Sequence, residues 1–180
     1  THLFCLSTMT CTFPEKWKIA DVVPIPKTPS PQIDNLRPIS KLPVCSKVLE
    51  KLVLDSVKER IVMNYGDNQF GFRPKTSTLH AHIAIQEYVT SKLDNPVIKD
   101  ILLISFDMSK AFDKLDHRSL IETLNRSNLP KDFIEWCRSY LRDRKQRVVL
   151  HPSTKSRLTC ATSGVPQGSV LAPFLFAAHM

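Results

Sequence analysis

An apolar run that ends in a carboxylate constrains this chain more than any other feature of its sequence. Residues 101–106 read Ile-Leu-Leu-Ile-Ser-Phe, and Asp107 follows directly. A run of this length and composition predicts a buried β-strand, so we expect Asp107 to be held at the strand's exit. Mg²⁺ prefers a few well-placed carboxylate oxygens and completes its octahedron with phosphate oxygens and waters. The stretch therefore predicts a mount for a divalent metal ion.

The acids that follow Asp107 also have simpler interpretations. Aspartate after a strand is common in turns. Asp116 directly precedes His117-Arg118-Ser119-Leu120, where it would serve as a helix N-cap. These acids alone therefore do not establish a metal site.

The composition favours a folded, basic protein. The chain has 180 residues, 42% of them apolar, and a net charge of +8. A core of ordinary size is possible, and the positive charge favours an acidic partner, for which nucleic acid is the first candidate. The basic residues from Arg138 to Arg147 form the densest cluster and are candidates for such a contact.

The cysteines and the apolar runs bear on the compartment. The five cysteines are widely spaced and include no C-x-x-C pair, so they predict reduced core residues of an intracellular protein. No apolar run approaches the roughly 20 residues that cross a bilayer, and no signal peptide is visible. The chain begins with Thr1 and ends at Met180 in an apolar segment, so we expect it to be a piece of a longer protein.

Strand and helix patterns alternate before the central run. Residues 19–25 predict a strand, and Pro24 and Pro26 predict that it lies at a sheet edge because neither has an N–H. Pro38 favours an extended conformation at the residue before it. Helices are predicted over residues 44–62 and from Ser77 or Thr78 to about residue 95.

A helix–helix–hairpin–helix order follows the central run. Helices are predicted over residues 117–128 and from Pro130 to about residue 141. Residues 146–150 and 157–162 predict a β-hairpin. A glycine-bounded loop over residues 163–173 then opens another helix.

Five short motifs occur in a fixed order along the chain. They are Ile25-Pro26-Lys27, Leu36-Arg37-Pro38-Ile39-Ser40, Gln69-Phe70-Gly71-Phe72-Arg73, Phe106-Asp107 through Lys110-Ala111-Phe112-Asp113, and Gly164-Val165-Pro166-Gln167-Gly168-Ser169. In this order they resemble the reverse transcriptase domain of non-LTR (LINE-type) retrotransposons, over residues 13–176. The resemblance implies an α+β, right-hand polymerase fold. It divides the chain into an N-terminal flank at 1–12, fingers at 13–97 and a partial palm at 98–180.

The resemblance also implies a chemistry. The family's enzymes are RNA-directed DNA polymerases that take an RNA template, a DNA primer and dNTPs and act inside the cell, in the nucleus. Asp107 matches the catalytic carboxylate that binds both of two Mg²⁺ ions, for which Mn²⁺ can substitute. The backbone carbonyl of Met108 is a further candidate ligand, since hard ions also accept carbonyl oxygens.

Several other residues match the family's nucleotide site. Lys27 and Arg37 match residues that grip the triphosphate, where positive charge complements the transferring group. Phe112 matches the aromatic residue beneath the incoming sugar, which excludes a 2′-hydroxyl; the alternative is an ordinary core phenylalanine. Gln167 and Gly168 match the loop that packs against the incoming nucleotide and the template base, and a glycine permits close backbone approach.

Two further residues complete the comparison with the family. Arg73 matches a position near the template. Asp113 is typical of the family, and we interpret it as orienting the loop or capping a helix rather than binding metal.

The departures from the family limit what this piece is expected to do. Thr76 replaces an arginine or histidine of the family pattern, and no Tyr/Phe-x-Asp-Asp strand follows to supply the remaining metal carboxylates. We therefore expect these 180 residues alone not to polymerise. The alternatives are a non-catalytic nucleic-acid-binding remnant of a truncated element and a small metal-dependent phosphohydrolase built on Asp107, Asp113 and Asp116.

Overall fold

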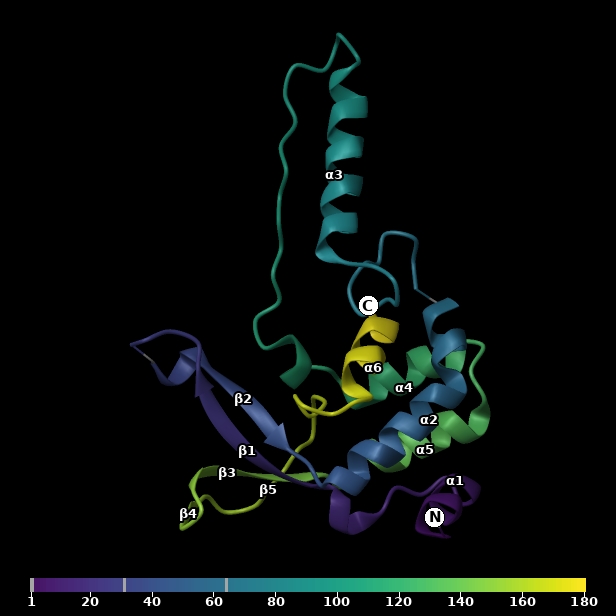
Figure 1. Cartoon of the computed structure of the whole chain (residues 1–180), viewed down its shortest axis with the longest axis vertical. Helices are drawn as coiled ribbons and strands as arrows, with labels where there is room; N and C mark the ends of the chain where they lie inside the picture. Colours follow the sequence, from purple (N-terminus) through teal and green to yellow (C-terminus); the bar gives the residue numbers. More distant parts are fainter. Residues whose placement is uncertain (1, 31, 64) are drawn as a thin grey trace. The chain divides into compact units, whose positions relative to one another are not determined.

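The protein contains one β-sheet and several helices. The computed structural model describes residues 2–30, 32–63 and 65–180, and only the backbone of Asp34 and Met63 (Figure 1). Six α-helices and a five-stranded sheet occur in this described part. The chain divides into two compact units, residues 1–64 with 110–180, and residues 65–109. The predicted division into fingers and palm stays a prediction.

The sheet lies entirely in the first unit. Its strands are β1 (Ile19–Pro26), β2 (Leu36–Lys41), β3 (Lys145–His151), β4 (Thr154–Lys155) and β5 (Thr159–Cys160). The spatial order is β2-β1-β3-β4, and β5 also pairs with β3. β1 runs antiparallel to β2 and parallel to β3. The predicted hairpin is thus present, with its returning strand split into two short pieces.

β1 is an interior strand, so the prediction of an edge strand is wrong. Its ladder with β3 runs only from Ile19 to Val22, whereas its ladder with β2 continues to Pro26. Pro24 and Pro26 fall where β3 is no longer a partner, because a proline cannot donate to a second ladder. The prolines limit the length of one ladder without placing the strand at the edge.

Four helices pack beside the sheet and form the core of the first unit. They are α2 (Val44–Met63), α4 (His117–Arg126), α5 (Lys131–Leu141) and α6 (Ala172–His179) (Figure 1). Leu49, Leu120 and Leu175 are fully buried among them. The backbone N–H of Ser119 donates to Asp116 Oδ1 at 2.7 Å. Asp116 therefore caps α4, as the sequence predicts.

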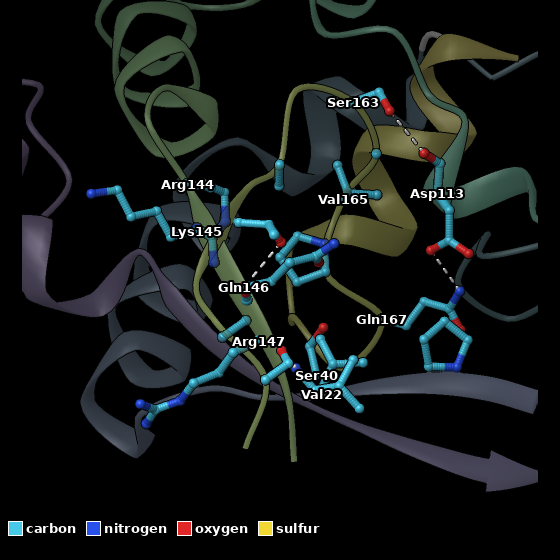
Figure 2. Close-up of a pocket in the computed structure, with 18 residues that line it drawn as sticks. Val22, Ser40, Asp113, Arg144, Lys145, Gln146, Arg147, Ser163, Val165 and Gln167 are labelled. Carbon is cyan, nitrogen blue, oxygen red and sulfur yellow. Dashed lines mark hydrogen bonds between the residues drawn. The ribbon is translucent and has the colours of Figure 1, made fainter. Parts of the chain in front are cut away.

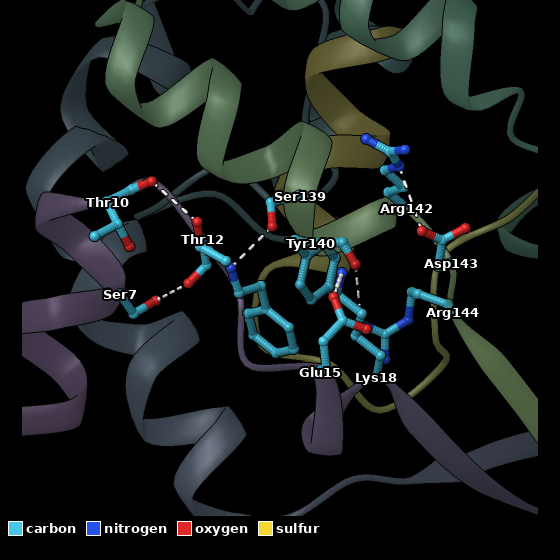
Figure 3. A network of polar contacts seen from close by, with 11 residues as sticks. Ser7, Thr10, Thr12, Glu15, Lys18, Ser139, Tyr140, Arg142, Asp143 and Arg144 are labelled. Carbon is cyan, nitrogen blue, oxygen red and sulfur yellow. Dashed lines mark hydrogen bonds and ion pairs between the residues drawn. The ribbon is translucent and has the colours of Figure 1, made fainter.

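The N-terminal segment belongs to the same core. After α1 (His2–Met9), Phe13 is fully buried and stands edge-on to Trp136 and Tyr140 of α5, with ring centroids 5.4 and 5.1 Å apart. Its backbone N–H donates to Ser139 Oγ at 2.9 Å (Figure 3). These contacts tie the residue that follows the predicted flank to α5, more than 120 residues further along the chain.

The second unit contains one helix, α3 (Thr78–Leu93), within the residues described. Ser77 precedes it as the N-cap, and its backbone N–H donates to His80 Nδ1 at 3.1 Å. This confirms the predicted helix start. In the part of the chain that the structure covers, no helix is long and apolar enough to cross a membrane.

The predicted strand at 101–107 is not formed. Residues 98–108 belong to no helix or strand, and Leu102 and Phe106 are 83% and 90% exposed. A strand needs a partner whose backbone groups complete the ladder, and none pairs with this segment in the described part of the chain. The apolar pattern predicts a preference for burial but not the presence of a partner. Asp107 is therefore exposed rather than held at a strand's end.

The cysteines are only partly as predicted. All five are free, but only Cys137 is buried, and Cys5, Cys45 and Cys160 are exposed. The prediction of core positions holds for Cys137 alone, and the prediction of reduced thiols stays a prediction.

Candidate functional site

The loop over residues 163–168 is fixed between two other elements of the first unit. It follows β5 and leads into α6. On one side, the Ser40 backbone N–H of β2 donates to the Gln167 carbonyl at 2.7 Å. On the other, the Val165 N–H donates to the Phe112 carbonyl at 2.9 Å, and the Gly164 N–H donates to the Leu115 carbonyl at 2.7 Å. These backbone hydrogen bonds join β2 and the turn before α4 through one loop, which we call the Gln167 loop.

Two glycines permit this close packing. Gly164 has φ +78°, and a Cβ there would lie 2.7 Å from the carbonyl oxygen of Asp113. Gly168 has φ +123°, and a Cβ there would lie 2.7 Å from the Ser40 carbonyl oxygen. Both the left-handed conformation and the close approach exclude larger residues. The neighbour that requires glycine at position 168 is thus β2, and the predicted close approach of Gly168 to a nucleotide stays a prediction.

Side chains hold the same loop. Gln167 Nε2 donates to Asp113 Oδ1 at 2.9 Å, and Ser163 Oγ donates to the Asp113 carbonyl at 3.2 Å (Figure 2). His117 Nε2 lies 2.7 Å from the Gly164 carbonyl, which can only accept, so this nitrogen donates. Asp113 therefore orients the loop, as predicted from the sequence.

A buried carboxylate anchors the residues that directly follow the Gln167 loop. Glu50 of α2 is fully buried, and its Oε2 accepts hydrogen bonds from Ser169 Oγ at 2.6 Å and from the Val170 and Leu171 N–H groups at 2.9 and 3.3 Å. Its Oε1 accepts from Ser46 Oγ at 2.9 Å. A buried carboxylate is tolerated when donors surround it in this way. Glu50 thereby satisfies backbone groups at the start of α6.

Tyr140 extends this network. Its hydroxyl donates to Ser169 Oγ at 2.9 Å, and burial raises the pKa of Tyr140 well above its usual value. The sequence analysis did not identify Glu50 as part of the site. A signal exists: Leu54 and Val57 lie four and seven positions further along the helix and are buried, which puts Glu50 on the buried face.

A cavity of about 290 Å³ lies between the Gln167 loop and one face of the sheet. Ala20 and Val22 of β1 supply apolar lining, and Gln146, Ser163 and Gln167 supply polar groups (Figure 2). An apolar floor with a few amide and hydroxyl groups suits a ligand with a flat apolar face and polar edges.

The predicted triphosphate contacts are not gathered at this cavity. Lys27 follows β1, its backbone N–H donates to the Asn35 carbonyl at 3.3 Å, and its side chain is exposed. Arg37 is exposed on β2, and strand alternation places it on the face opposite to Pro38 and Ser40. The structure therefore brings Gln167 and Gly168 together with the turn that carries Phe112, but neither Lys27 nor Arg37 lines the cavity.

Phe112 is held in place without being an ordinary core residue. It lies in a short 3₁₀ turn (Ala111–Asp113), is half-buried, and stacks on Phe176 of α6 with ring centroids 4.8 Å apart. Its role at the sugar stays a prediction.

The Arg138–Arg147 cluster does not form one basic face. Arg138 and Arg142 lie near Glu135 and Asp143, at 3.4 and 3.3 Å. Arg144 is buried, with its guanidinium 4.7 Å from the centre of the Tyr140 ring. Lys145 and Arg147 belong to β3. The basic residues of this cluster do not share one surface, because they belong to the end of α5, to a buried turn and to β3.

The remaining predicted site residues belong to the second unit. Asp107 and Met108 are exposed there, and Arg73 Nη1 donates to the Gly66 carbonyl at 3.4 Å. Over residues 2–30, 32–63 and 65–180, no three His, Cys, Asp or Glu side chains come close enough to hold a metal ion. Asp113 and Asp116 are already engaged with Gln167 and α4. Because Asp113 and Asp116 already have these hydrogen-bond partners, the structure gives no support to the phosphohydrolase hypothesis. Asp107 stays the one predicted metal carboxylate.

Comparisons with known proteins agree with the sequence motifs. A family model described as "Reverse transcriptase (RNA-dependent DNA polymerase)" matches residues 25–180. The probable RNA-directed DNA polymerase from transposon BS of Drosophila melanogaster is 34% identical over 170 residues, covering 91% of this chain and 18% of that protein.

Other mobile elements give similar matches. The RNA-directed DNA polymerase from mobile element jockey of Drosophila melanogaster is 30% identical over 91% of this chain, and 18% of its own length is matched. A Pol polyprotein from the type-1 retrotransposable element R2 of Popillia japonica is 25% identical over 79% of the chain and 19% of its own length. The chain thus spans about a fifth of the curated relatives it matches. It belongs to the reverse transcriptase family, on the branch of the non-LTR retrotransposons.

Proposed function

We propose that this chain is the nucleotide-positioning part of an RNA-directed DNA polymerase from a non-LTR retrotransposon, with fingers and a partial palm of a right-hand polymerase fold. The observation that carries the proposal is the Gln167 loop, which is fixed by backbone hydrogen bonds to both Ser40 and the Phe112 turn. A loop fixed on two sides keeps its position when a nucleotide arrives, and such preorganisation favours reaction.

We assign a different part of the nucleotide or template to each of the residues around the loop. Gln167 and Gly168 would meet the incoming nucleotide and template base, and Phe112 would support the sugar and exclude a 2′-hydroxyl. Lys27 and Arg37 would contact the triphosphate, and Arg73 the template. For Arg37 this requires a position other than the one described above, on the face of β2 opposite to Ser40.

The metal site would be shared with residues outside these 180. Asp107 and the Met108 carbonyl have the oxygen donors that Mg²⁺ prefers, and Mn²⁺ could take the same place. When bound, two such ions supply stabilisation of the attacking and leaving oxygens. One carboxylate is too few for two ions, so this chain alone would not polymerise.

A chimera tests the proposal. Residues 25–180 would replace the matching stretch of the transposon BS polymerase, and extension of a DNA primer on an RNA template would be measured. We expect the chimera to extend the primer, and Asp107→Asn to reduce extension to background while leaving the fold intact, because the amide loses the charge that holds the metals. We expect Phe112→Val to retain activity and to admit ribonucleotides.

The same assay separates the polymerase from a non-catalytic nucleic-acid-binding remnant. The exposed position of Asp107, outside any helix or strand, keeps the remnant as a second candidate. A folded chimera that binds primer–template but does not extend it, beside an active parent polymerase, would favour the remnant and contradict the proposed function.

A further inference from the structure

The strands of the sheet carry far more positive than negative charge. Asp21 is the one acidic residue in the five strands. Against it stand five cations on three strands of one sheet: Arg37, Lys41, Lys145, Arg147 and Lys155.

The register places all five cations on the same face. Lys41 of β2 and Arg147 of β3 both lie directly opposite Asp21 of β1. Arg37 and Lys145 lie opposite Ile25 and Ile19, which share the face of Asp21 because side chains alternate along a strand. Lys155 lies opposite Val149, two residues beyond Arg147 on β3. We call this surface the cationic face.

The other side of the sheet faces the Gln167 loop. Val22, Ser40 and Gln146 alternate with the cations along their strands and line the cavity beneath that loop. Figure 2 shows the Lys145 and Arg147 side chains extending away from Val165 and Gln167. Lys145 and Arg147 also border the cavity, and the alternation along β3 directs their side chains to the cationic face.

Among the residues that the structure describes, Arg147 is the one cation of this face that has an acidic partner. Arg147 Nε donates to Asp21 Oδ1 at 2.7 Å, and Nη2 to Oδ2 at 3.5 Å. The hydrogen bond from Arg147 lowers the pKa of Asp21, and the charges of Lys155 and Lys41 lower it further against the opposing effect of burial. Their influence on Asp21 agrees with the register, which places both lysines on its side of the sheet.

The remaining cations are available to a partner. Arg37, Lys41, Lys145 and Lys155 are exposed and form no ion pair with any residue that the structure describes. Five cations and one acid leave a net charge of +4 on the face. From β2 to β4 they extend over three inter-strand spacings of about 4.8 Å each. This linear spread suits consecutive phosphates along a strand better than a single phosphate group.

We propose that the cationic face is a docking surface for the phosphate backbone of single-stranded RNA, separate from the Gln167 loop. It would hold RNA with little sequence preference, since phosphate contacts carry no sequence information. The inference goes beyond the proposed polymerase function, because this binding needs no metal ion, no primer end and no nucleotide.

Matched charge variants of the 180-residue chain test the proposal. The face variant is Lys41→Gln, Lys145→Gln, Lys155→Gln. The control variant is Lys16→Gln, Arg126→Gln, Lys131→Gln, which removes the same charge from exposed positions outside the strands. Anisotropy of a fluorescent oligouridylate about 20 nucleotides long would be titrated over a range of salt without divalent metal, with circular dichroism to compare folding.

We expect the face variant to bind at least ten-fold more weakly, and the control variant to change affinity far less. For a single strand each lost phosphate contact reduces the slope of log K against log salt by about 0.7, so the slope should fall by about 2. Equal losses in both variants, or no loss in the face variant, would overturn the proposal.

Asp21→Asn is a second variant that tests the proposal if the triple face variant folds poorly. Removing the acid releases Arg147 and should tighten RNA binding several-fold, whereas Asp132→Asn on the exposed start of α5 should change it little. Unchanged or weaker binding by Asp21→Asn would also overturn the proposal. None of these outcomes depends on whether the chimera above extends a primer.

Discussion

The Gln167 loop and the segment around Asp107 differ in how their backbone groups are satisfied. The loop exchanges hydrogen bonds with β2, with the turn at Phe112 and with Glu50 of α2, all within one compact unit. Residues 98–108 belong to no ladder, and their large apolar side chains are mostly exposed. The backbone position of the Gln167 loop is thus fixed by hydrogen-bond partners that lie in the same unit. The comparison shows that hydrogen bonds can fix the backbone of one proposed functional motif, the Gln167 loop, while another, the segment around Asp107, belongs to no helix or strand.

The largest expected effect comes from adding a side chain at Gly164, in the Gln167 loop. Gly164→Val must adopt φ +78° and place a Cβ 2.7 Å from the Asp113 carbonyl oxygen, so we expect a loss of about 3–5 kcal/mol in the free energy of unfolding. Urea denaturation would measure it. Gly71→Val is the control, because its nearest atom lies 3.5 Å from the added Cβ and belongs to a flexible side chain. Equal losses at the two glycines would contradict the tight seating of the loop.

A smaller loss is expected when the buried carboxylate is removed. Glu50→Leu leaves Ser169 Oγ and the Val170 N–H without their acceptor, which should cost about 3 kcal/mol. Ser46→Ala removes only a bond within α2 and should cost about 1 kcal/mol. Hydrogen exchange should accelerate at residues 169–172 in Glu50→Leu and stay slow in Ser46→Ala. Slow exchange in both variants would show that Glu50 does not anchor the loop.

The smallest expected effect concerns Asp21 and Arg147, a partly exposed pair on the sheet. The pKa of Asp21 is lowered in the folded state, so the pair stabilises the fold above the carboxyl's unfolded pKa. This contribution is lost as pH falls through the lowered folded-state pKa. Asp21→Asn should therefore have a slightly lower Tm than wild type at neutral pH, and the difference should shrink as the pH falls below the usual pKa range of an aspartate. A constant difference across that range would show that Asp21 acts by packing instead.

The sequence predicted the features that depend on local chemistry. Asp116 as a helix cap follows from what aspartate does before a helix. Asp113 was expected to orient a loop or cap a helix, and it orients the Gln167 loop. The helices beginning at Val44, Thr78 and His117 follow from apolar periodicity and capping residues.

What the sequence could not predict depends on partners distant along the chain. The interior position of β1 comes from its pairing with β3, more than 120 residues away, which the prolines at its far end did not reveal. The role of Glu50 comes from the Ser169 segment, again more than 100 residues away. The apolar run before Asp107 was interpreted as a strand because its composition favours burial, but composition does not supply a neighbouring strand.

Hydrogen–deuterium exchange on the 180-residue chain tests the central contrast most directly. We predict slow exchange at the amides of Ser40, Gly164 and Val165, which donate hydrogen bonds around the Gln167 loop. We predict exchange close to the unfolded-chain rate at residues 101–107, which have no ladder partner in the described structure. Equal protection of the two segments, or stronger protection at 101–107, would contradict the account.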